Sequence, residues 1–334
     1  MASLKEIKDR IASVSGTLKI TSAMKMVASA KLHKAQQAIG NMLPYEKCLH
    51  GMLIDLMGSV NMSAQDAYSL MAQREVRRVA IVAFASNSSL CGAFNSNAIR
   101  EAASVINEYR AAGLRDADIT VYSVGRKMAE AMRRLGFPSP SDFTRMSDSP
   151  SYEAASALAR ELLDNFVSGR FDKVELVYNH YKSTSSQPTA RLTYLPLSLA
   201  DATADLQAGK VAEHAEATDS MVRQAHQSAA GVTSTTHSVS EPVEAPYTAE
   251  APDMIIEPSP EAIVQVLLPK VVRLRIFTTL LDSAAAEHAA RTVAMQLATD
   301  NGNDLLQELT LEYNKGRQQK ITSEILDLVG GSLQ

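Results

Sequence analysis

Positively charged side chains gather near the start of the chain. Four lysines and a histidine lie between residues 16 and 44, with no Asp or Glu among them: Lys19, Lys25, Lys31, Lys34 and His33. A helix that carries only positive charge favours a partner that is acidic or bears phosphate. A solvated basic face is an equally good interpretation of these residues. Nucleic acid is a weaker one, because no aromatic residues interleave with the lysines.

A second candidate for chemistry is the turn Ser86–Asn95, which joins an apolar run to a helical stretch. Strand, turn and helix in this order begin many dinucleotide sites, and Cys91 could act as a nucleophile. The turn, however, holds one glycine where the dinucleotide fingerprint needs three, and the sequence has no phosphate-loop motif. No histidine is tied to Cys91 by a motif, so a small, partly buried thiol is the favoured interpretation. We predict no catalytic residue and no cofactor.

Metal binding and disulfides are not expected either. His214, His226 and His237 are widely spaced, whereas metal ligands cluster tightly and usually include Cys or carboxylates. Cys48 and Cys91 are too few for a disulfide framework, which indicates a reducing compartment.

The composition favours helix-on-helix packing in a soluble protein. The 334 residues include no Trp, 14 Met and only 5% aromatic residues, and the net charge is −4. The start of the chain does not look like a signal peptide, and the longest apolar runs are far too short to span a bilayer. If the protein works at a membrane, we expect it to dock on another protein there.

The middle of the chain alternates between strand and helix patterns. The expected strands are Arg77–Ala85, Ile119–Val124, Val174–Tyr178 and Ala190–Leu197, and the expected helices are Ser96–Ala111, Arg126–Leu135 and Ser151–Val167. This alternation predicts a Rossmann-like open α/β sheet covered on both faces.

Both ends of the chain carry narrow apolar stripes at helical spacing. The first consists of Leu4, Ile7, Ile11, Val14 and Leu18; the second consists of Ala294, Leu297, Ala298, Asn301, Leu305, Leu309, Tyr313, Gly316, Ile321, Ile325 and Leu328. Stripes this thin suit two long helices that bury each other in an antiparallel coiled coil. Some fifty residues give a rod of roughly 75 Å.

Local signals fix the limits of these two helices. Ser3 and Glu6 form a capping box at the start of the first helix, which Pro44 should kink or end. Ser259 should cap the second helix, which is expected to kink at Pro269 and to run to Val329.

These patterns divide the chain into four parts. We expect an N-terminal coiled-coil helix (1–58), an α/β head domain (74–200), a low-complexity insertion or loop (201–252) and a C-terminal coiled-coil helix (253–331). Within the insertion, the Ala-rich stretch 202–231 suits a surface helix, and 232–252 suits a mobile loop. Two alternatives remain: a nucleotide-binding enzyme of the Rossmann type with a coiled-coil appendage, and a plain coiled-coil scaffold.

Three segments carry a resemblance to a known family. The run Lys19–Lys31 (KITSAMKMVASAK), the turn Ser89–Asn95 (SLCGAFN) and the run Ala294–Leu328 resemble the gamma subunit of bacterial F-type ATP synthase. The resemblance covers about 1–200 and 253–331. It implies a central rotating stalk that has no catalytic site of its own and couples ion flow to ATP synthesis or hydrolysis.

The resemblance also implies partners and a location. The helical pair would sit inside a ring of alpha and catalytic beta subunits. The head would rest on the membrane ring of c subunits, with the epsilon subunit alongside. The protein would be peripheral on the cytoplasmic face of the bacterial inner membrane, with no direct insertion and no nucleic acid.

Two sets of contact residues follow from the resemblance. The first would meet the catalytic ring: Lys19, Met24, Lys25, Lys31, Lys34, Arg317, Gln318 and Thr322. The second would meet the c ring: Met254, Ile256 and Glu257. From the residues alone, Arg317 could instead pair with Glu312 or Glu324 on its own helix.

Overall fold

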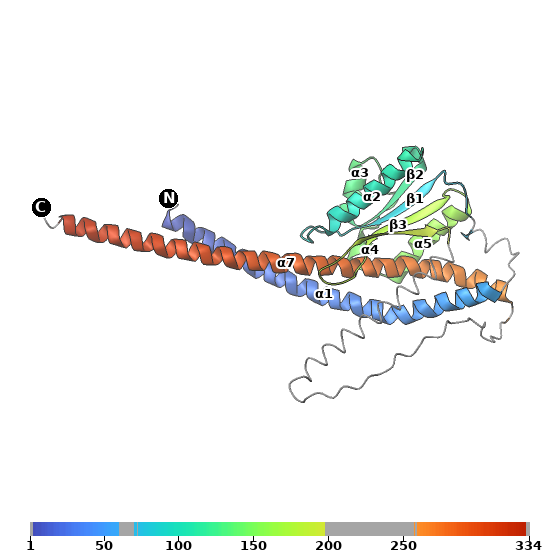
Figure 1. The fold of residues 1–334 in the computed structure, drawn as a ribbon, viewed down its shortest axis with the longest axis horizontal. Coiled ribbons are helices and arrows are strands. Elements are labelled where there is room, and N and C mark those ends of the chain that lie inside the picture. The colour runs from blue at the N-terminus through green and yellow to red at the C-terminus, as the bar shows by residue number, and fades with distance from the viewer. Residues whose placement is uncertain (1–2, 60–69, 72, 198–256, 258, 332–334) are drawn as a thin grey trace, which may run out of the picture.

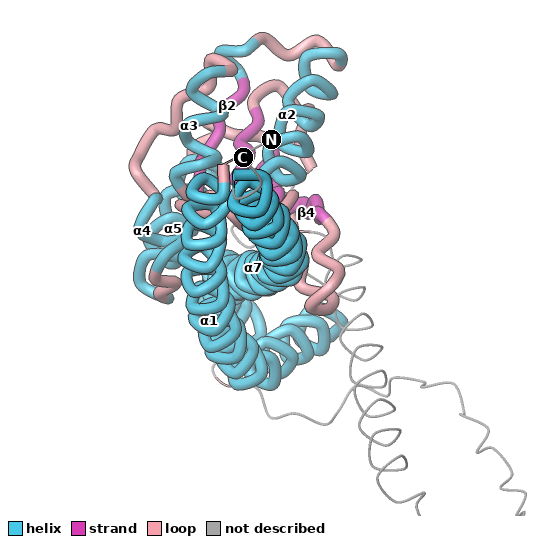
Figure 2. The backbone as a smooth tube through the Cα atoms, turned by 90° about the vertical axis from the view of Figure 1, so that its left-hand side faces the viewer, coloured by secondary structure: helices cyan, strands magenta, loops and turns pink. Residues whose placement is uncertain are grey.

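Two long helices carry an α/β head on one side. A computed structural model describes residues 3–59, 70–71, 73–197, 257 and 259–331. Helices α1 (Leu4–Ser59) and α7 (Pro260–Gly331) run side by side, and the head lies against α7 (Figure 1). Figure 2 views the molecule from the end where the N- and C-termini lie. The antiparallel helical pair predicted from the apolar stripes is confirmed.

The head contains the strands and helices predicted from the alternating pattern. They are β1 (Val79–Phe84), α2 (Phe94–Ala111), β2 (Ile119–Val124), α3 (Arg126–Arg134), α5 (Tyr152–Val167), β3 (Lys173–Asn179) and β4 (Thr189–Leu195). Two short elements were not predicted, the helix α4 (Thr144–Asp148) and the 3₁₀ turn Asp116–Asp118. The strand order is β2-β1-β3-β4, with β1 parallel to β2 and β3, and β4 antiparallel to β3.

The sheet is covered on both faces, as expected. Successive side chains of a strand point to opposite faces. Val79, Ile81 and Ala83 of β1 therefore pack with α2 and α3, whereas Ala80, Val82 and Phe84 pack with α5 and α7. All six residues of β1 are buried, which explains its continuous apolar sequence.

The first half of α7 belongs to the core of the head. Val264, Val272 and Ile276 are fully buried. The hydroxyl of Tyr194 in β4 donates to the carbonyl of Val272 at 2.9 Å. The start of α7 is capped as predicted, because the amide of Ala262 donates to Ser259 Oγ at 3.3 Å.

The second half of α7 packs along α1. We call the paired stretch, residues 4–32 of α1 with 285–316 of α7, the shaft; its first residues, 285–291, also contact the head. A Cβ placed on Gly316 would lie 3.1 Å from Leu4, and one on Gly302 would lie 2.6 Å from Leu18. Leu32 packs with Ala285 and Ala289. Residue numbers rise along α1 as they fall along α7, so the register is continuous.

The face of α7 that meets α1 differs from the predicted stripe. Between residues 295 and 316, the buried or half-buried residues of α7 are Met295, Gln296, Ala298, Thr299, Gly302, Leu306, Leu309, Tyr313 and Gly316. Leu297 and Leu305, which were assigned to the stripe, are 58% and 45% exposed. The physical reason is that the glycines, having no side chain, let Leu4 and Leu18 of α1 approach the helix backbone.

The expected break at Pro44 is only partly correct. Pro44 lies inside α1, which continues to Ser59 rather than ending there. Figure 1 shows that α1 changes direction in its second half, as a proline inside a helix favours. Pro269 is likewise inside α7. At the other end, the amide of Glu6 donates to Ser3 Oγ at 3.2 Å, as the capping box predicts.

Candidate interaction surfaces of the shaft, tip and neck

The last turns of α7 project beyond α1. Leu4, at the start of α1, already lies beside Gly316, and Figure 1 shows α7 continuing past that point. We call residues 317–331 the tip. Ile321, Ile325 and Leu326 of the tip are 47%, 54% and 66% exposed. A helix end with this much exposed apolar surface indicates a surface for another protein.

The polar residues expected to contact a partner are exposed on this tip. Arg317, Gln318 and Thr322 are all exposed, and the hydroxyl of Thr322 donates to the carbonyl of Gln318 at 2.9 Å. Within the described length of α7, Arg317 makes no ion pair with Glu312 or Glu324. Glu324 instead lies 3.8 Å from Lys320. The guanidinium of Arg317 is therefore available to a partner.

The four lysines of α1 do not form the single basic face that the sequence indicated. Lys19 and Lys34 are exposed, Lys25 is half-buried, and Lys31 lines a cavity beside the head. Lys25 and Lys34 are nine residues apart, which places them on about opposite sides of the helix at 3.6 residues per turn. The charge is therefore spread around α1. Met24 is half-buried and lines the same cavity as Lys31.

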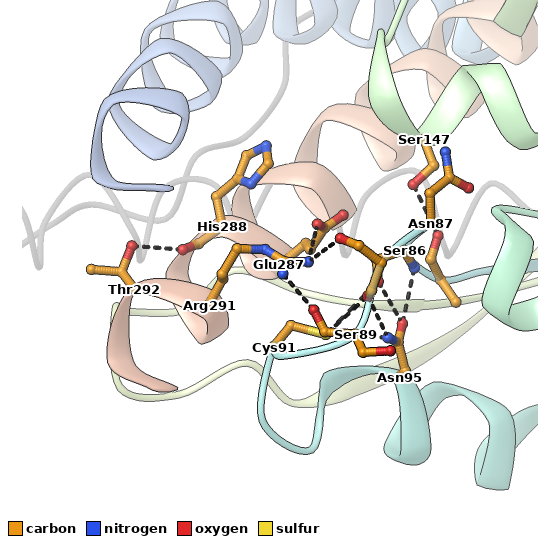
Figure 3. Close-up of polar contacts among 12 residues, drawn as sticks. Ser86, Asn87, Ser89, Cys91, Asn95, Ser147, Glu287, His288, Arg291 and Thr292 are labelled. Atoms are coloured by element: carbon orange, nitrogen blue, oxygen red, sulfur yellow. Dashed lines mark hydrogen bonds and ion pairs between the residues drawn. The ribbon is translucent and has the colours of Figure 1, made fainter. Parts of the chain in front are cut away.

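A buried arginine joins α7 to the turn after β1. We call the region where this turn, α4 and residues 287–291 of α7 meet α1 the neck (Figure 3). Arg291 Nη1 donates to the carbonyl of Ser89 at 2.5 Å, and Nη2 donates to Ser88 Oγ and to Glu287 Oε1, both at 2.8 Å. Because both partners of the ion pair are nearly buried, these contacts fix the turn on α7.

Burial shifts the pKa values of two neighbouring groups, Glu287 and His288. Burial raises the pKa of Glu287 above its usual value, although Arg291 opposes the shift. Burial, with help from the charges of Lys31 and Arg291, lowers the pKa of His288 to about 4. His288 is therefore neutral at pH 7. Its Nδ1 atom is buried and has no hydrogen-bond partner among the described residues.

A cavity of about 330 Å³ lies between α1 and the neck. Its wall on α1 includes Met24, Val27 and Lys31. The opposite wall is formed by Ser88, by Ser147 and Asp148 of α4, and by Glu287, His288 and Arg291 of α7. Four separate elements thus meet around one space, where charged and apolar groups lie side by side.

The turn that suggested a nucleotide site is filled by protein. Dinucleotides bind beside the carboxyl ends of parallel strands, where the strand order reverses. Here Cys91 and Phe94 pack with Ala286 of α7 at that position. The side-chain amide of Asn179 in β3 donates to the carbonyl of Phe94 at 3.3 Å. Cys91 is 2% exposed, which agrees with the interpretation of a buried thiol that fills space.

The remaining candidate residues lie at the edge of the described structure or outside it. Glu257 is exposed in a bend before α7. Met254 and Ile256 lie outside the described residues, as do the insertion 201–252 and its three histidines. Within the described ranges, no group of His, Cys, Asp and Glu has the geometry of a metal site. No helix there is both long and apolar enough to cross a membrane.

Sequence reasoning missed the neck. Its signal was present in the run AAAEHAAR, which places Glu287 and Arg291 four residues apart among small residues. An ion pair at this spacing is ordinary on an exposed helix. The alanines around this pair have small side chains, which instead indicated a helix that packs closely against other elements.

Comparison with known proteins identifies the family. A family model described as ATP synthase matches residues 3–333. The ATP synthase gamma chain of Phocaeicola vulgatus is 48% identical over 333 residues, with all of both chains covered. The ATP synthase gamma chain of Bacteroides thetaiotaomicron is 47% identical over 334 residues, again with full coverage of both.

Solved structures share the fold at low sequence identity. A chain of the Euglena gracilis mitochondrial ATP synthase OSCP/F1/c-ring structure is 18% identical and superposes with a TM-score of 0.56, covering 99% of this chain and 93% of that one. A chain of the Euglena gracilis rotor structure gives a TM-score of 0.53 at 18% identity, covering 95% and 98%. Taken with the full-length relatives and the shaft, tip and head described above, these matches show that the chain belongs to the ATP synthase gamma chain family.

Proposed function

We propose that this chain is the central rotor shaft of an F-type ATP synthase. In this role it couples ion flow through a membrane c ring to ATP synthesis or hydrolysis in a ring of alpha and beta subunits. The observation that carries the proposal is the tip, a helix end that projects beyond its partner helix and exposes Ile321, Ile325 and Leu326. A surrounding sleeve of protein would cover these side chains.

The shaft is suited to transmit torque. Moving one elementary charge through 100 mV releases about 2.3 kcal/mol, and several such steps must be stored before one nucleotide is made. Two helices in continuous contact can twist elastically without separating, whereas a single helix would bend. The chain itself performs no chemistry in this proposal. Unequal contacts with the catalytic subunits shift their conformational populations.

The contacts with the catalytic ring follow from the exposed polar groups. Arg317 and Gln318 on the tip, with Lys19 and Lys34 on α1, are available to alpha and beta subunits. Thr322 lies on the same tip. Lys25, Lys31 and Met24 are closer to α7 and the neck, so their contribution would depend on how a partner approaches that region.

The opposite end of the molecule would meet the membrane sector. Glu257, with Met254 and Ile256 before it, would contact the c ring, and the epsilon subunit would lie beside the head. The protein would then be peripheral at the cytoplasmic face of the bacterial inner membrane, held there by its partners.

Shortening the tip tests the main proposal. Deleting residues 317–334 removes the unpaired tip but keeps Gly316 beside Leu4, so the shaft remains intact. We expect the complex to assemble and the rate of ATP synthesis in reconstituted vesicles to fall several-fold because torque is lost. A full rate of ATP synthesis in this truncation would contradict the proposal.

Charge reversal tests the contacts of α1. The double variant Lys19→Glu and Lys34→Glu should lower the ratio of ATP made to ions moved. A matched control reverses Arg133 and Arg134, two exposed charges on α3 of the head. If both variants lower the ratio equally, general charge explains the effect and the proposed contact is wrong.

A further inference from the structure

The neck cavity has the size and construction of a small-molecule site. Its volume of about 330 Å³ lies within the range of known ligand pockets, roughly 300–1,000 Å³. Side chains from α1, the turn after β1, α4 and α7 all face it.

The wall on α1 is apolar apart from Lys31. Val27 is 58% exposed and Met24 is half-buried, and both line the cavity. Ala23 beside them leaves room, because its side chain is a single methyl group. An aliphatic group placed against this wall would remove apolar surface from water.

Two opposite charges stand at the rim with no ion-pair partner in the described part of the chain: Lys31 on α1 and Asp148 on α4. The other two charged groups of the lining, Glu287 and Arg291, neutralise each other at 2.8 Å. Among the described residues, the cavity therefore presents one unpaired cation, Lys31 on the α1 wall, and one unpaired anion, Asp148 on the opposite wall.

We propose that the neck cavity binds a small zwitterion with an aliphatic body. The carboxylate of the ligand pairs with Lys31, its ammonium pairs with Asp148, and its methylenes lie on Met24 and Val27. A ligand with only one charge makes only one of these two ion pairs, which weakens its binding. This proposal does not depend on the role of the chain as a rotor.

The ligand class is tested by calorimetric titration of the full chain. The probe is 6-aminohexanoate, which carries both charges on an aliphatic chain. Hexanoate and hexylamine each lack one of the charges. We expect both to bind about two- to fivefold more weakly than the zwitterion, because each loses one ion pair with an exposed group. Equal binding of hexylamine and the zwitterion overturns the proposal, as does no binding of any probe.

The location of the site is tested with variants. Lys31→Met and Asp148→Asn should each weaken binding of 6-aminohexanoate about two- to fivefold, and Ala23→Phe should abolish it by filling the cavity. Lys31, Asp148 and Ala23 are exposed, so these variants are expected to fold. Lys8→Met and Asp304→Asn change exposed charges away from the cavity and should leave binding unchanged. If the control variants weaken binding as much as the cavity variants, the site is not the neck cavity.

Discussion

Helix α7 has different surroundings in its first and second halves. Between Val264 and Ala289, α7 is surrounded by the sheet, α5 and α1, and most of its side chains are buried. From Met295 onward it packs along α1, and Leu297 and Leu311 are 58% and 70% exposed. The number of neighbours changes, whereas the helix itself continues without a break.

This difference separates the part of α7 that stabilises the fold from the part whose surface is available to partners. The half of α7 in the head is held by packing on several sides, so the fold anchors the shaft. The shaft half buries one narrow stripe and leaves the rest of its surface free for partners. We therefore expect equivalent substitutions to cost much more in the head than in the shaft.

The largest contrast should come from two glycines. A Cβ on Gly125, whose φ is +96°, would lie 2.0 Å from the backbone oxygen of Ala85. A Cβ on Gly302 would meet only the movable end of Leu18 at 2.6 Å. Gly125→Ala should destabilise the chain by more than about 4 kcal/mol. Gly302→Ala should stay within about 1 kcal/mol of the wild type, because alanine also favours the helix. Urea unfolding measures the free energy of unfolding of both variants. Similar losses in the two would contradict the division between head and shaft.

Truncating buried side chains tests the same difference in stability between head and shaft. Ile276 is fully buried in the head, so Ile276→Ala should cost about 2–5 kcal/mol. Leu309 is 7% exposed in the shaft, where one side of the helix is open and can relax, so we expect a loss of about 2 kcal/mol. Leu311→Ala serves as the exposed control, with a change within about 0.5 kcal/mol. A greater loss at Leu309 than at Ile276 would contradict the division.

The neck between the two halves should be sensitive to acid. The pKa of His288 is lowered to about 4 in the folded chain from an ordinary 6.5, by burial and by Lys31 and Arg291, against the opposing charge of Asp148. Between these values the unfolded chain binds the extra proton, so the stability contributed by neutral His288 is complete above pH 6.5 and is lost as pH falls toward 4. Between pH 7 and pH 5 the loss should be about 2 kcal/mol.

The matched variant isolates this histidine from its neighbours. Glu287, whose raised pKa acts in the opposite direction, is present in both the wild type and His288→Gln. The free energy of unfolding of the wild type should therefore fall more steeply between pH 7 and pH 5 than that of the variant. Parallel pH profiles would show that His288 does not titrate as its environment indicates.

The fold could be predicted from the sequence because its patterns are local. Strand β1 and the stripe of Leu4 and Ile7 follow from apolar spacing, and the caps at Ser3 and Ser259 follow from residue type. The face of α7 in the shaft could not, because two adjacent stripes offer similar apolar residues. The glycines, which decide between them, matter only once Leu4 and Leu18 lie opposite.

The candidate site residues also divide into those whose environment the sequence could predict and those whose environment it could not. Exposure of Arg317 and Gln318 follows from a polar run at the end of a helix. The environment of Lys31 does not, because the cavity arises only when α1, α4 and α7 meet. Sequence spacing places a side chain on its own helix, whereas the neighbours of that helix come from the tertiary fold.

The smallest effect tests whether the shaft is held by shape or by polar contacts. Thr299 Oγ1 donates to Thr21 Oγ1 at 3.0 Å across the two helices. Thr299→Val leaves Thr21 without this partner and should cost about 1 kcal/mol. Replacing both with valine restores a matched apolar pair, so the double variant should lose less than the sum of the two single changes. Losses that simply add in this double-mutant cycle, measured by urea unfolding, would show that the two hydroxyls are not coupled. They would also leave the stripe of small residues as the main contact that holds the shaft together.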